Sequence, residues 1–191
     1  PIIQKIAREQ NPRLVSAIFV YPTKALSRDQ LPKIQEVAKS AGISAAIFDG
    51  DTKQKERQEI LDNPPQIIIT NFDVIHYHLM FRTKFASMLS SVQYLVVDEA
   101  HVYSGIFGSN VHYIIKRLKR VCRKIQVVAA SATLDNALEF CQDLFGEKMI
   151  LVEGSGKKGE TDFVMVFPSL RTQRALTIDL LERLVGKKHK T

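Results

Sequence analysis

The feature that most constrains this chain is the stretch 94–101, with the sequence YLVVDEAH, in which an apolar run ends abruptly at two adjacent carboxylates. Four β-prone residues before an acidic pair are typical of a buried parallel strand that carries charge at its carboxyl end. Open α/β sheets bind their ligands at that edge. We therefore expect Asp98 and Glu99 to lie at a functional sheet edge.

The two carboxylates are expected to have separate tasks, because neighbouring strand residues point to opposite faces of a sheet. In phosphoryl transfer one acid holds Mg²⁺, usually through water, and another residue orients or deprotonates the attacking water. On this hypothesis Asp98 is the metal residue and Glu99 is the base. An isolated Asp-Glu pair is more often a helix cap, so the hypothesis depends on what else lies nearby.

Other apolar runs of the chain also end in polar residues. The run 15–21 leads into Pro-Thr-Lys-Ala-Leu at 22–26, and the run 125–130 leads into Ser-Ala-Thr at 131–133. His101 follows the acidic pair almost directly. In a parallel sheet the carboxyl ends of these runs would meet at one edge.

Strand-like and helix-like segments alternate along the chain, which predicts right-handed parallel crossovers and a three-layer α/β sandwich with helices on both faces of the sheet. Strands are expected at 14–21, 43–48, 66–70, 94–97, 125–130 and 149–152. Helices are expected at 1–8, 23–41, 53–61, 84–89, 111–122 and 137–145, and another from Asn71 or Asp73 to about Met80.

Three residues are expected to shape these helices. Pro32 should kink the helix 23–41 or mark a fresh helical start, and Gly42 should end that helix. Asp135 should cap the helix 137–145.

Length and composition favour one full domain with the beginning of a second, since the chain has 191 residues and 45% hydrophobic content. No stretch approaches 18 consecutive apolar residues, and nothing resembles a cleaved signal. We expect an intracellular protein with no membrane partner.

The charge balance of 27 basic and 20 acidic residues gives +7, which favours a polyanionic partner. Six of the nine residues 116–124 are Lys or Arg. Apolar residues of the same segment fall on the opposite arc of a helical wheel, which indicates a solvated helix face more than a nucleic-acid groove.

The cysteines and the HxH pattern give little sign of a metal site. Cys122 and Cys141 are 19 residues apart without a CxxC partner, so reduced thiols are expected. His76 and His78 have no third ligand nearby in the sequence, which makes a metal role a minor alternative.

Three of these polar segments resemble motifs of a known family. The sequences PTKAL (22–26), DEAH (98–101) and SAT (131–133), in this order, look like motifs Ia, II and III of superfamily 2 DEAD/DEAH-box helicases. The stretches FDGDT (48–52) and ITNFDVIH (69–76), together with HVYSGIFGSNV (101–111), are similar to the YprA-like (MrfA-type) branch of DNA helicases. Family members often have proline where Phe72 stands.

The resemblance implies a RecA-like ATP-binding domain at 1–153 that lacks its N-terminal part, a linker at 154–162, and the beginning of a second RecA-like domain at 163–191. A strand at 163–167 and a helix at 175–185 are expected in that last part. No GxxxxGK[ST] occurs in the sequence, so the phosphate-binding loop of the family is expected upstream of Pro1. This piece of a longer protein is expected to be inactive by itself.

The resemblance also implies roles for the residues that match the ATP motifs. Asp98 would hold Mg²⁺ through water and Glu99 would activate the attacking water. His101, Ser131 and Thr133 would couple the state of the bound ATP to closure of two motor domains.

A second set of residues would face the nucleic-acid strand. Backbone amides and hydroxyls at helix starts suit phosphate and carry no sequence information. Each of these residues could instead be a helix cap or a turn residue. The set comprises Pro22, Thr23, Lys24, Gly50, Arg57, Thr70 and Asn71.

The function predicted from these residues is part of an ATP-dependent helicase or translocase, with ATP and Mg²⁺ as cofactors and DNA rather than RNA as partner. One alternative is a nucleic-acid-binding module with a degenerate ATPase, which would have a damaged acidic pair. Another is an unrelated two-carboxylate hydrolase, which would have further metal ligands at other strand ends. The intact Asp98 and Glu99, and the lack of such ligands in the sequence, disfavour both.

Overall fold

The computed structural model describes residues 1–8, 14–122, 124–132, 136–152 and 172–186. The chain divides into two units, residues 1–152 and residues 153–191. In the second unit the described part is mainly the helix α8 (Gln173–Gly186), where the sequence predicts a helix. The strand predicted at 163–167 lies outside the described residues.

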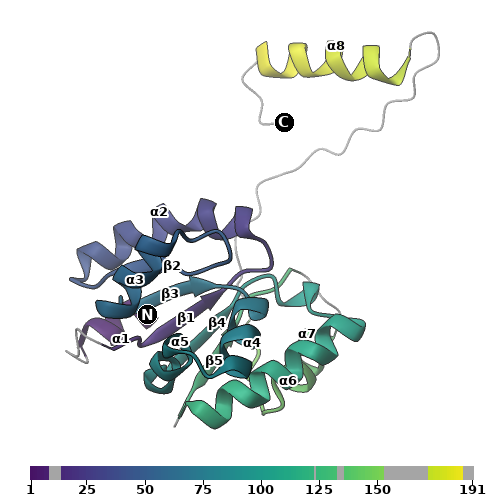
Figure 1. Ribbon diagram of the computed structural model, residues 1–191. Helices are drawn as coiled ribbons and strands as arrows, with labels where there is room; N and C mark the ends of the chain where they lie inside the picture. The colour runs from purple at the N-terminus through teal and green to yellow at the C-terminus, as the bar shows by residue number, and fades with distance from the viewer. Residues whose placement is uncertain (9–13, 123, 133–135, 153–171, 187–191) are drawn as a thin grey trace. The chain divides into compact units, whose positions relative to one another are not determined.

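The first unit contains a parallel sheet in the order β2-β3-β1-β4-β5 (Figure 1). Val20 lies opposite both Thr70 and Val97, and Val97 lies opposite Ala129, so the carboxyl ends of the strands are level. The five described strands are β1 (Ala17–Val20), β2 (Ala45–Ile47), β3 (Ile67–Thr70), β4 (Tyr94–Val97) and β5 (Gln126–Ala129).

Helices cover both faces of this sheet, which confirms the predicted three-layer α/β sandwich (Figure 1). One face packs against α1 (Ile2–Arg8) and α2 (Lys24–Ser40). The other face packs against α3 (Gln54–Asp62), α4 (Phe72–Phe81), α5 (Lys84–Met88), α6 (Gly105–Val121) and α7 (Ala137–Phe145). Two 3₁₀ turns, η1 (Leu89–Ser91) and η2 (Ala100–Val102), lie before and after β4.

The crossovers of the sheet reverse their direction at β1. The connection from β1 to β2 runs toward one edge of the sheet through α2, whereas the later connections run toward the other edge through helices on the opposite face. A reversal of direction together with a reversal of face is what a single crossover hand requires. The loop after β1 therefore leaves the sheet on the opposite side from the loops after its neighbours, and such points bind ligands in open α/β sheets.

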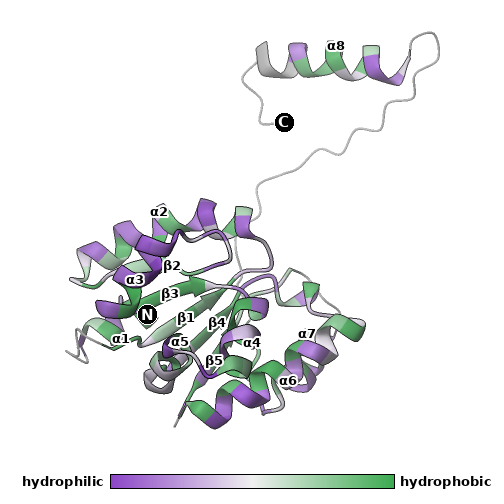
Figure 2. Ribbon diagram, viewed as in Figure 1, coloured by the Kyte–Doolittle hydropathy of each residue, from purple (hydrophilic) through white to green (hydrophobic). Residues whose placement is uncertain are grey.

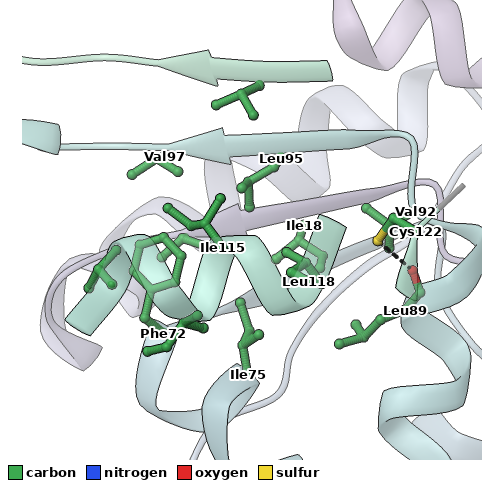
Figure 3. Close-up of a cluster of buried hydrophobic side chains, with 14 of the residues drawn as sticks. Ile18, Phe72, Ile75, Leu89, Val92, Leu95, Val97, Ile115, Leu118 and Cys122 are labelled. Carbon is green, nitrogen blue, oxygen red and sulfur yellow. Dashed lines mark hydrogen bonds between the residues drawn. The ribbon is translucent and has the colours of Figure 1, made fainter. Parts of the chain in front are cut away.

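The core between the sheet and the α4–α6 layer consists of interlocking aliphatic and aromatic side chains (Figure 3). Leu95 of β4 lies among Ile75 of α4 and Leu118 of α6, and all three side chains are fully buried. At one end the Cys122 thiol donates to the Leu89 carbonyl oxygen at 3.1 Å, and burial raises the pKa of Cys122 to about 12. Cys122 and Cys141 are both free, as predicted, and both are buried.

The hydropathy of the residues shows the three layers of the fold, with hydrophobic (green) strands between helices that also carry hydrophilic (purple) residues (Figure 2).

The ends of α2 follow the sequence prediction, whereas its middle does not. The Thr23 hydroxyl accepts the Leu26 amide at 3.2 Å, and Gly42 follows the helix with a left-handed φ of 73°. Of the two alternatives predicted for Pro32, a kink or a fresh helical start, the fresh start was wrong, because the helix is unbroken there. Pro32 is on the exposed face, where water can solvate the carbonyl that its ring leaves without an amide partner.

The strand predicted at 149–152 was also wrong. These residues form no strand, and Ile150 and Val152 are 89% and 86% exposed. An apolar run becomes a strand only where a sheet edge pairs with it, and no such pairing occurs in the described part of the chain. Asp135 lies outside the described residues, and Asn136 holds the N-cap position of α7 without a side-chain capping bond. None of the described helices combines the length and the apolar character that a membrane span requires.

Candidate functional site

Most of the predicted site residues lie at or just after the carboxyl ends of five strands that are bonded to one another, whereas Arg57 lies in α3. Backbone hydrogen bonds extend the ladder one residue past the strands, with lengths of 2.8–3.2 Å. These bonds fix the loop starts relative to each other, so the polar segments do meet at one edge. They run from Phe48 N to Ile69 O, Tyr21 N to Thr70 O, Asp98 N to Val20 O, and Ala130 N to Val97 O.

The acidic pair lies in a tight turn and not in the strand itself. Asp98 follows the last residue of β4 and its Oδ1 accepts the amide of Glu99 at 3.0 Å. Glu99 has φ 50° and ψ 45°, a left-handed conformation that costs a non-glycine residue about 1–2 kcal/mol. The Ala100 amide donates to the Ala130 carbonyl at 2.9 Å and holds the turn against the end of β5. The turn, and not strand alternation, therefore separates the directions of the two carboxylates.

Two strand ends bring Glu99, His101 and Ser131 together. The Nδ1 atom of His101 lies 3.3 Å from Glu99 Oε2 and 3.4 Å from Ser131 Oγ. Both side-chain partners of this ring are partly open to solvent, so their contacts can exchange when a ligand binds nearby. These two contacts thus link the turn after β4 to the loop after β5 through the imidazole of His101. Thr133 lies outside the described residues.

The charge of Asp98 affects the pKa of two tyrosines that sequence reasoning missed. Burial, and then the Asp98 charge, raise the pKa of Tyr21 to about 12. Burial also raises the pKa of Tyr103, with smaller contributions from the charges of Asp73 and Asp98. Tyr21 directly follows β1, the neighbour of β4, and that position after a strand end was the available signal. Tyr103 follows η2, where the sequence has no such signal.

Asp98 fits the usual way in which proteins hold Mg²⁺. That ion keeps several waters and is held by one or two carboxylates together with substrate phosphates. Among the described residues, no three His, Cys, Asp or Glu side chains are grouped so that they could hold a metal ion by themselves. His76 contacts Arg117 at 3.1 Å and His78 contacts the Thr83 hydroxyl at 2.7 Å, so the HxH pair has two separate structural partners.

Pro22, Thr23, Lys24 and Gly50 form an accessible part of the edge, after β1 and β2. Thr23 is exposed and caps α2, and Pro22 is half-buried beside it. The Lys24 amine bonds to Asp51 Oδ1 at 2.5 Å across the loop that contains Gly50. Gly50 is exposed, and a Cβ added there would lie 3.5 Å from the Lys24 amine.

The side chains of Thr70, Asn71 and Arg57 are engaged within the protein. Thr70 is 1% exposed and its hydroxyl donates to the Phe48 carbonyl at 2.7 Å. Asn71 caps α4 by accepting the Val74 amide at 2.9 Å. The Arg57 guanidinium donates to two carbonyl oxygens of the turn after β2, those of Thr52 at 2.8 Å and Asp49 at 2.6 Å. The sequence left open the alternative that these residues are helix-cap or turn residues, and that alternative describes these three side chains.

Some cations of the basic helix α6 are bonded within the protein and others are exposed to solvent. The Lys119 amine bonds to the Phe145 carbonyl at 2.7 Å and to Glu147 at 2.8 Å, and Arg117 contacts α4. Lys116 and Arg120 are exposed, as the solvated-face prediction requires. A cleft of about 480 Å³ between α6 and α7, lined by Tyr103, His112, Phe140 and Asp143 among others, contains none of the predicted site residues.

Comparison with known proteins matches residues 1–140 to the DEAD/DEAH box helicase family. The chain is 36% identical to ATP-dependent helicase YprA of Bacillus subtilis, over 89% of this chain and 23% of that protein. It is 33% identical to ATP-dependent helicase HRQ1 of Saccharomyces cerevisiae, over 82% of this chain and 16% of that protein. The chain therefore spans less than a quarter of the length of these relatives.

Among solved structures, the chain is similar to the DUF1998 helicase MrfA bound to DNA and AMPPNP, with a TM-score of 0.78 and 33% identity. The match covers 97% of this chain and 27% of that one. A likeness to the DEAD-box helicase Mss116, with a TM-score of 0.64 and 20% identity, shows the shared RecA-like fold. The family match over most of the chain and the parallel sheet with its DEAH turn lead to one conclusion: this chain belongs to the DEAD/DEAH box helicase family.

Proposed function

We propose that this chain supplies part of the first RecA-like motor domain of an ATP-dependent helicase or translocase that acts on DNA. The observation that carries the proposal is the contact of Glu99, His101 and Ser131 at the carboxyl ends of two neighbouring strands. The names of YprA and HRQ1 as ATP-dependent helicases support the activity. The DNA-bound state of MrfA supports the choice of DNA over RNA.

On this proposal the two acids have different tasks in ATP hydrolysis. Asp98 would hold Mg²⁺ through water, and the bound ion would neutralise charge on the phosphates. Glu99 orients the attacking water and accepts its proton. The left-handed turn sets the backbone position of Glu99, and its carboxylate contacts His101 before ATP arrives.

His101 and Ser131, together with Thr133, pass the state of the nucleotide to the rest of the motor. Departure of the γ-phosphate removes charge beside Glu99, and His101 Nδ1 can then change partner between Glu99 and Ser131. Because Ser131 follows β5 and Glu99 follows β4, that exchange links two loops of the sheet edge.

The nucleic-acid strand follows the loops after β1, β2 and β3, which we call the rim (residues 22–24, 49–52 and 70–71). These three strands are neighbours in the sheet, next to the β4–β5 part that carries the ATP residues. Thr23, Lys24 and Gly50 offer accessible hydroxyl, ammonium and backbone groups to phosphate, while Arg57, Thr70 and Asn71 shape the rim from within. Sugar-phosphate contacts of this kind are independent of sequence.

The proposed motor also requires parts beyond this chain's described fold. We propose a RecA-like domain at 1–153, a linker at 154–162 and the start of a second RecA-like domain at 163–191, with the phosphate-binding loop supplied by the longer protein. The division of the chain after residue 152 supports that boundary. The alternative of a nucleic-acid module with a degenerate ATPase is disfavoured because Asp98 and Glu99 are both present in a fixed turn.

The experiment is Glu99→Gln in the full-length protein. Loss of a positioned general base typically lowers the rate about 10²- to 10⁴-fold, while the amide preserves the shape of the side chain. We expect ATP to bind and DNA-stimulated phosphate release to fall within that range. Glu139→Gln, a carboxylate in the first turn of α7, is the matched control and should retain activity. Near-normal turnover of the Glu99→Gln protein would remove Glu99 from this role.

A further inference from the structure

A cluster of four charged side chains joins α2 to the turn after β2. The Lys24 amine lies 2.5 Å from Asp51 Oδ1, and Arg28 Nη2 lies 3.1 Å from Asp51 Oδ2. Arg28 Nη2 is also 3.4 Å from Asp49 Oδ2. Lys24 and Arg28 are four residues apart on α2 and so share one face of the helix. Both cations therefore face the loop that contains Gly50.

The two carboxylates of this cluster have different structural importance. Asp49 is 3% exposed, and its Oδ1 accepts the amides of Asp51 and Thr52 at 2.8 and 3.0 Å, which closes the turn. The Asp51 side chain is 49% exposed, and the bonds described for its carboxylate are those to Lys24 and Arg28. Those two cations hold the pKa of the Asp51 carboxyl below its usual range, with the Lys24 hydrogen bond as the largest cause.

The pairs made by Asp51 are easy to exchange. The side chains of Lys24 and Arg28 are 43% and 49% exposed, and ion pairs in such positions are weak because water and salt screen them. A phosphate can accept the same hydrogen bonds, and the planar guanidinium of Arg28 suits phosphate geometry. Within the described residues only Nη2 of that guanidinium is engaged, which leaves further N–H donors for a ligand.

We infer that Arg28 is a further phosphate-binding residue of the rim and that Asp51 is its displaceable counter-ion, which lowers the affinity of the free protein for a nucleic-acid strand. This inference rests on the proposed function. Asp51 competes with the incoming phosphate for Lys24 and Arg28, so the nucleic acid must displace a carboxylate before both cations can bind it. Asp51 thereby favours release of the nucleic acid, because it can pair again with Lys24 and Arg28.

The first test uses the 191-residue chain, a fluorescein-labelled 20-nucleotide oligo(dT), and anisotropy titrations from low to moderate salt. Asp51→Asn is compared with Asp62→Asn. The Asp62 side chain is 49% exposed, as is that of Asp51, and its carboxylate pairs with Lys84 at 2.8 Å. Asp62 is the last residue of α3, which runs from the rim to the amino ends of the strands. The two variants therefore have the same net charge but differ in their distance from the rim. Circular dichroism confirms that each variant is folded.

Asp51→Asn should tighten binding about two- to fivefold at low salt, the range expected from the worth of an exposed ion pair. The salt dependence should become steeper, by up to about 0.7 in the log–log slope, because no carboxylate is left to take up a counter-ion. Asp62→Asn should change the affinity less than 1.5-fold. Equal effects of the two variants would overturn the inference.

The second test removes the cation. Arg28→Gln should weaken binding and flatten the log–log slope by about 0.7, and it should reduce the gain from Asp51→Asn in the double variant. Lys33→Gln is the control, since Lys33 lies further along α2 in an exposed pair with Asp29 at 3.0 Å. An Arg28→Gln protein that binds like the control contradicts the inference.

The two proposals fail in different ways. If the chain binds oligo(dT) and Thr23→Asp weakens that binding, while Asp51→Asn and Arg28→Gln behave like their controls, the rim stands and the role of Arg28 and Asp51 is wrong. If the wild-type chain and every variant fail to bind at low salt, both proposals are wrong.

Discussion

Glu99 carries conformational strain at the position proposed for the general base. It is one of two non-glycine residues with positive φ among the described residues, and the other, Arg82, ends α4 with φ 47°. Strain of this kind persists where the surrounding structure over-determines a conformation, often at functional sites. The hydrogen bonds at Asp98 and Ala100 supply that constraint here.

The strain predicts that activity and stability oppose each other at this residue. Glu99→Gly should raise the free energy of unfolding of the 191-residue chain by about 1 kcal/mol, because glycine adopts the left-handed region without a Cβ clash. Arg82→Gly should give a similar gain at a position without a proposed function. Urea titrations measure both. A loss of stability in Glu99→Gly alone would mean that the contact with His101 outweighs the strain.

His78 predicts the pH dependence of stability. Burial, and secondly the charge of Arg57, lower the pKa of this imidazole, which packs against Phe48 and Phe85. The unfolded chain therefore binds a proton first as pH falls below about 6.5. The stabilising contribution is complete above that pH and is lost as pH falls toward the lower folded pKa.

We expect the free energy of unfolding to fall between pH 7.5 and 5.5, and to fall less in His78→Gln. Chemical denaturation at both pH values provides the comparison, with His76→Gln as the neighbouring control. An unchanged pH dependence in His78→Gln would assign the effect to other groups.

At the scale of elements, the start of α6 packs tightly against the segment that follows the acidic turn. A Cβ added at Gly108 would lie 2.2 Å from the Tyr103 carbonyl oxygen, a distance that requires backbone movement. The close approach holds the start of α6 against the backbone of the segment between His101 and Ser104. Gly108, the second glycine of the GIFGS stretch, is therefore required by packing.

Gly108→Ala should lower the free energy of unfolding by about 1–3 kcal/mol, the usual cost of overpacking. Gly50→Ala is the control, because Gly50 is exposed and its added Cβ would make an ordinary contact at 3.5 Å. That substitution should change stability by less than about 0.5 kcal/mol. Equal stability of the two variants would show that the chain before α6 relaxes without cost.

At the scale of the whole molecule, sequence patterns were sufficient for the parallel sheet because its strands are short apolar runs that end in polar residues. Asp98, Thr23 and Gly50 could be placed at one edge by that rule alone. The rule could not tell that the Thr70 hydroxyl turns inward to Phe48, because a hydroxyl after a strand can equally face solvent.

Tertiary contacts explain what the sequence did not predict. Arg28 and Asp51 are 23 residues apart and meet only because α2 and the turn after β2 share a sheet edge. Glu99 adopts a left-handed conformation that local propensity disfavours, since bonds from neighbouring strands hold it. The run 149–152 has strand propensity but pairs with no strand in the described part of the chain.

We expect a nucleic-acid strand to bind the rim and not the basic face of α6. Two double variants test it with matched charge. Thr23→Asp with Gly50→Asp alters the rim, and aspartate preserves the N-cap of α2. Lys116→Gln with Arg120→Gln removes the two exposed cations of α6. Each pair lowers the net charge of +7 by two.

The measurement is the affinity of the 191-residue chain for single-stranded oligo(dT) at low salt. The rim variant should bind at least about tenfold more weakly and show a flatter salt dependence, by about 0.7 for each phosphate that the protein no longer neutralises. The α6 variant should lose only the small, long-range part of the affinity that its charge change implies. A greater loss of affinity in the α6 variant, with the rim variant close to wild type, would contradict the account.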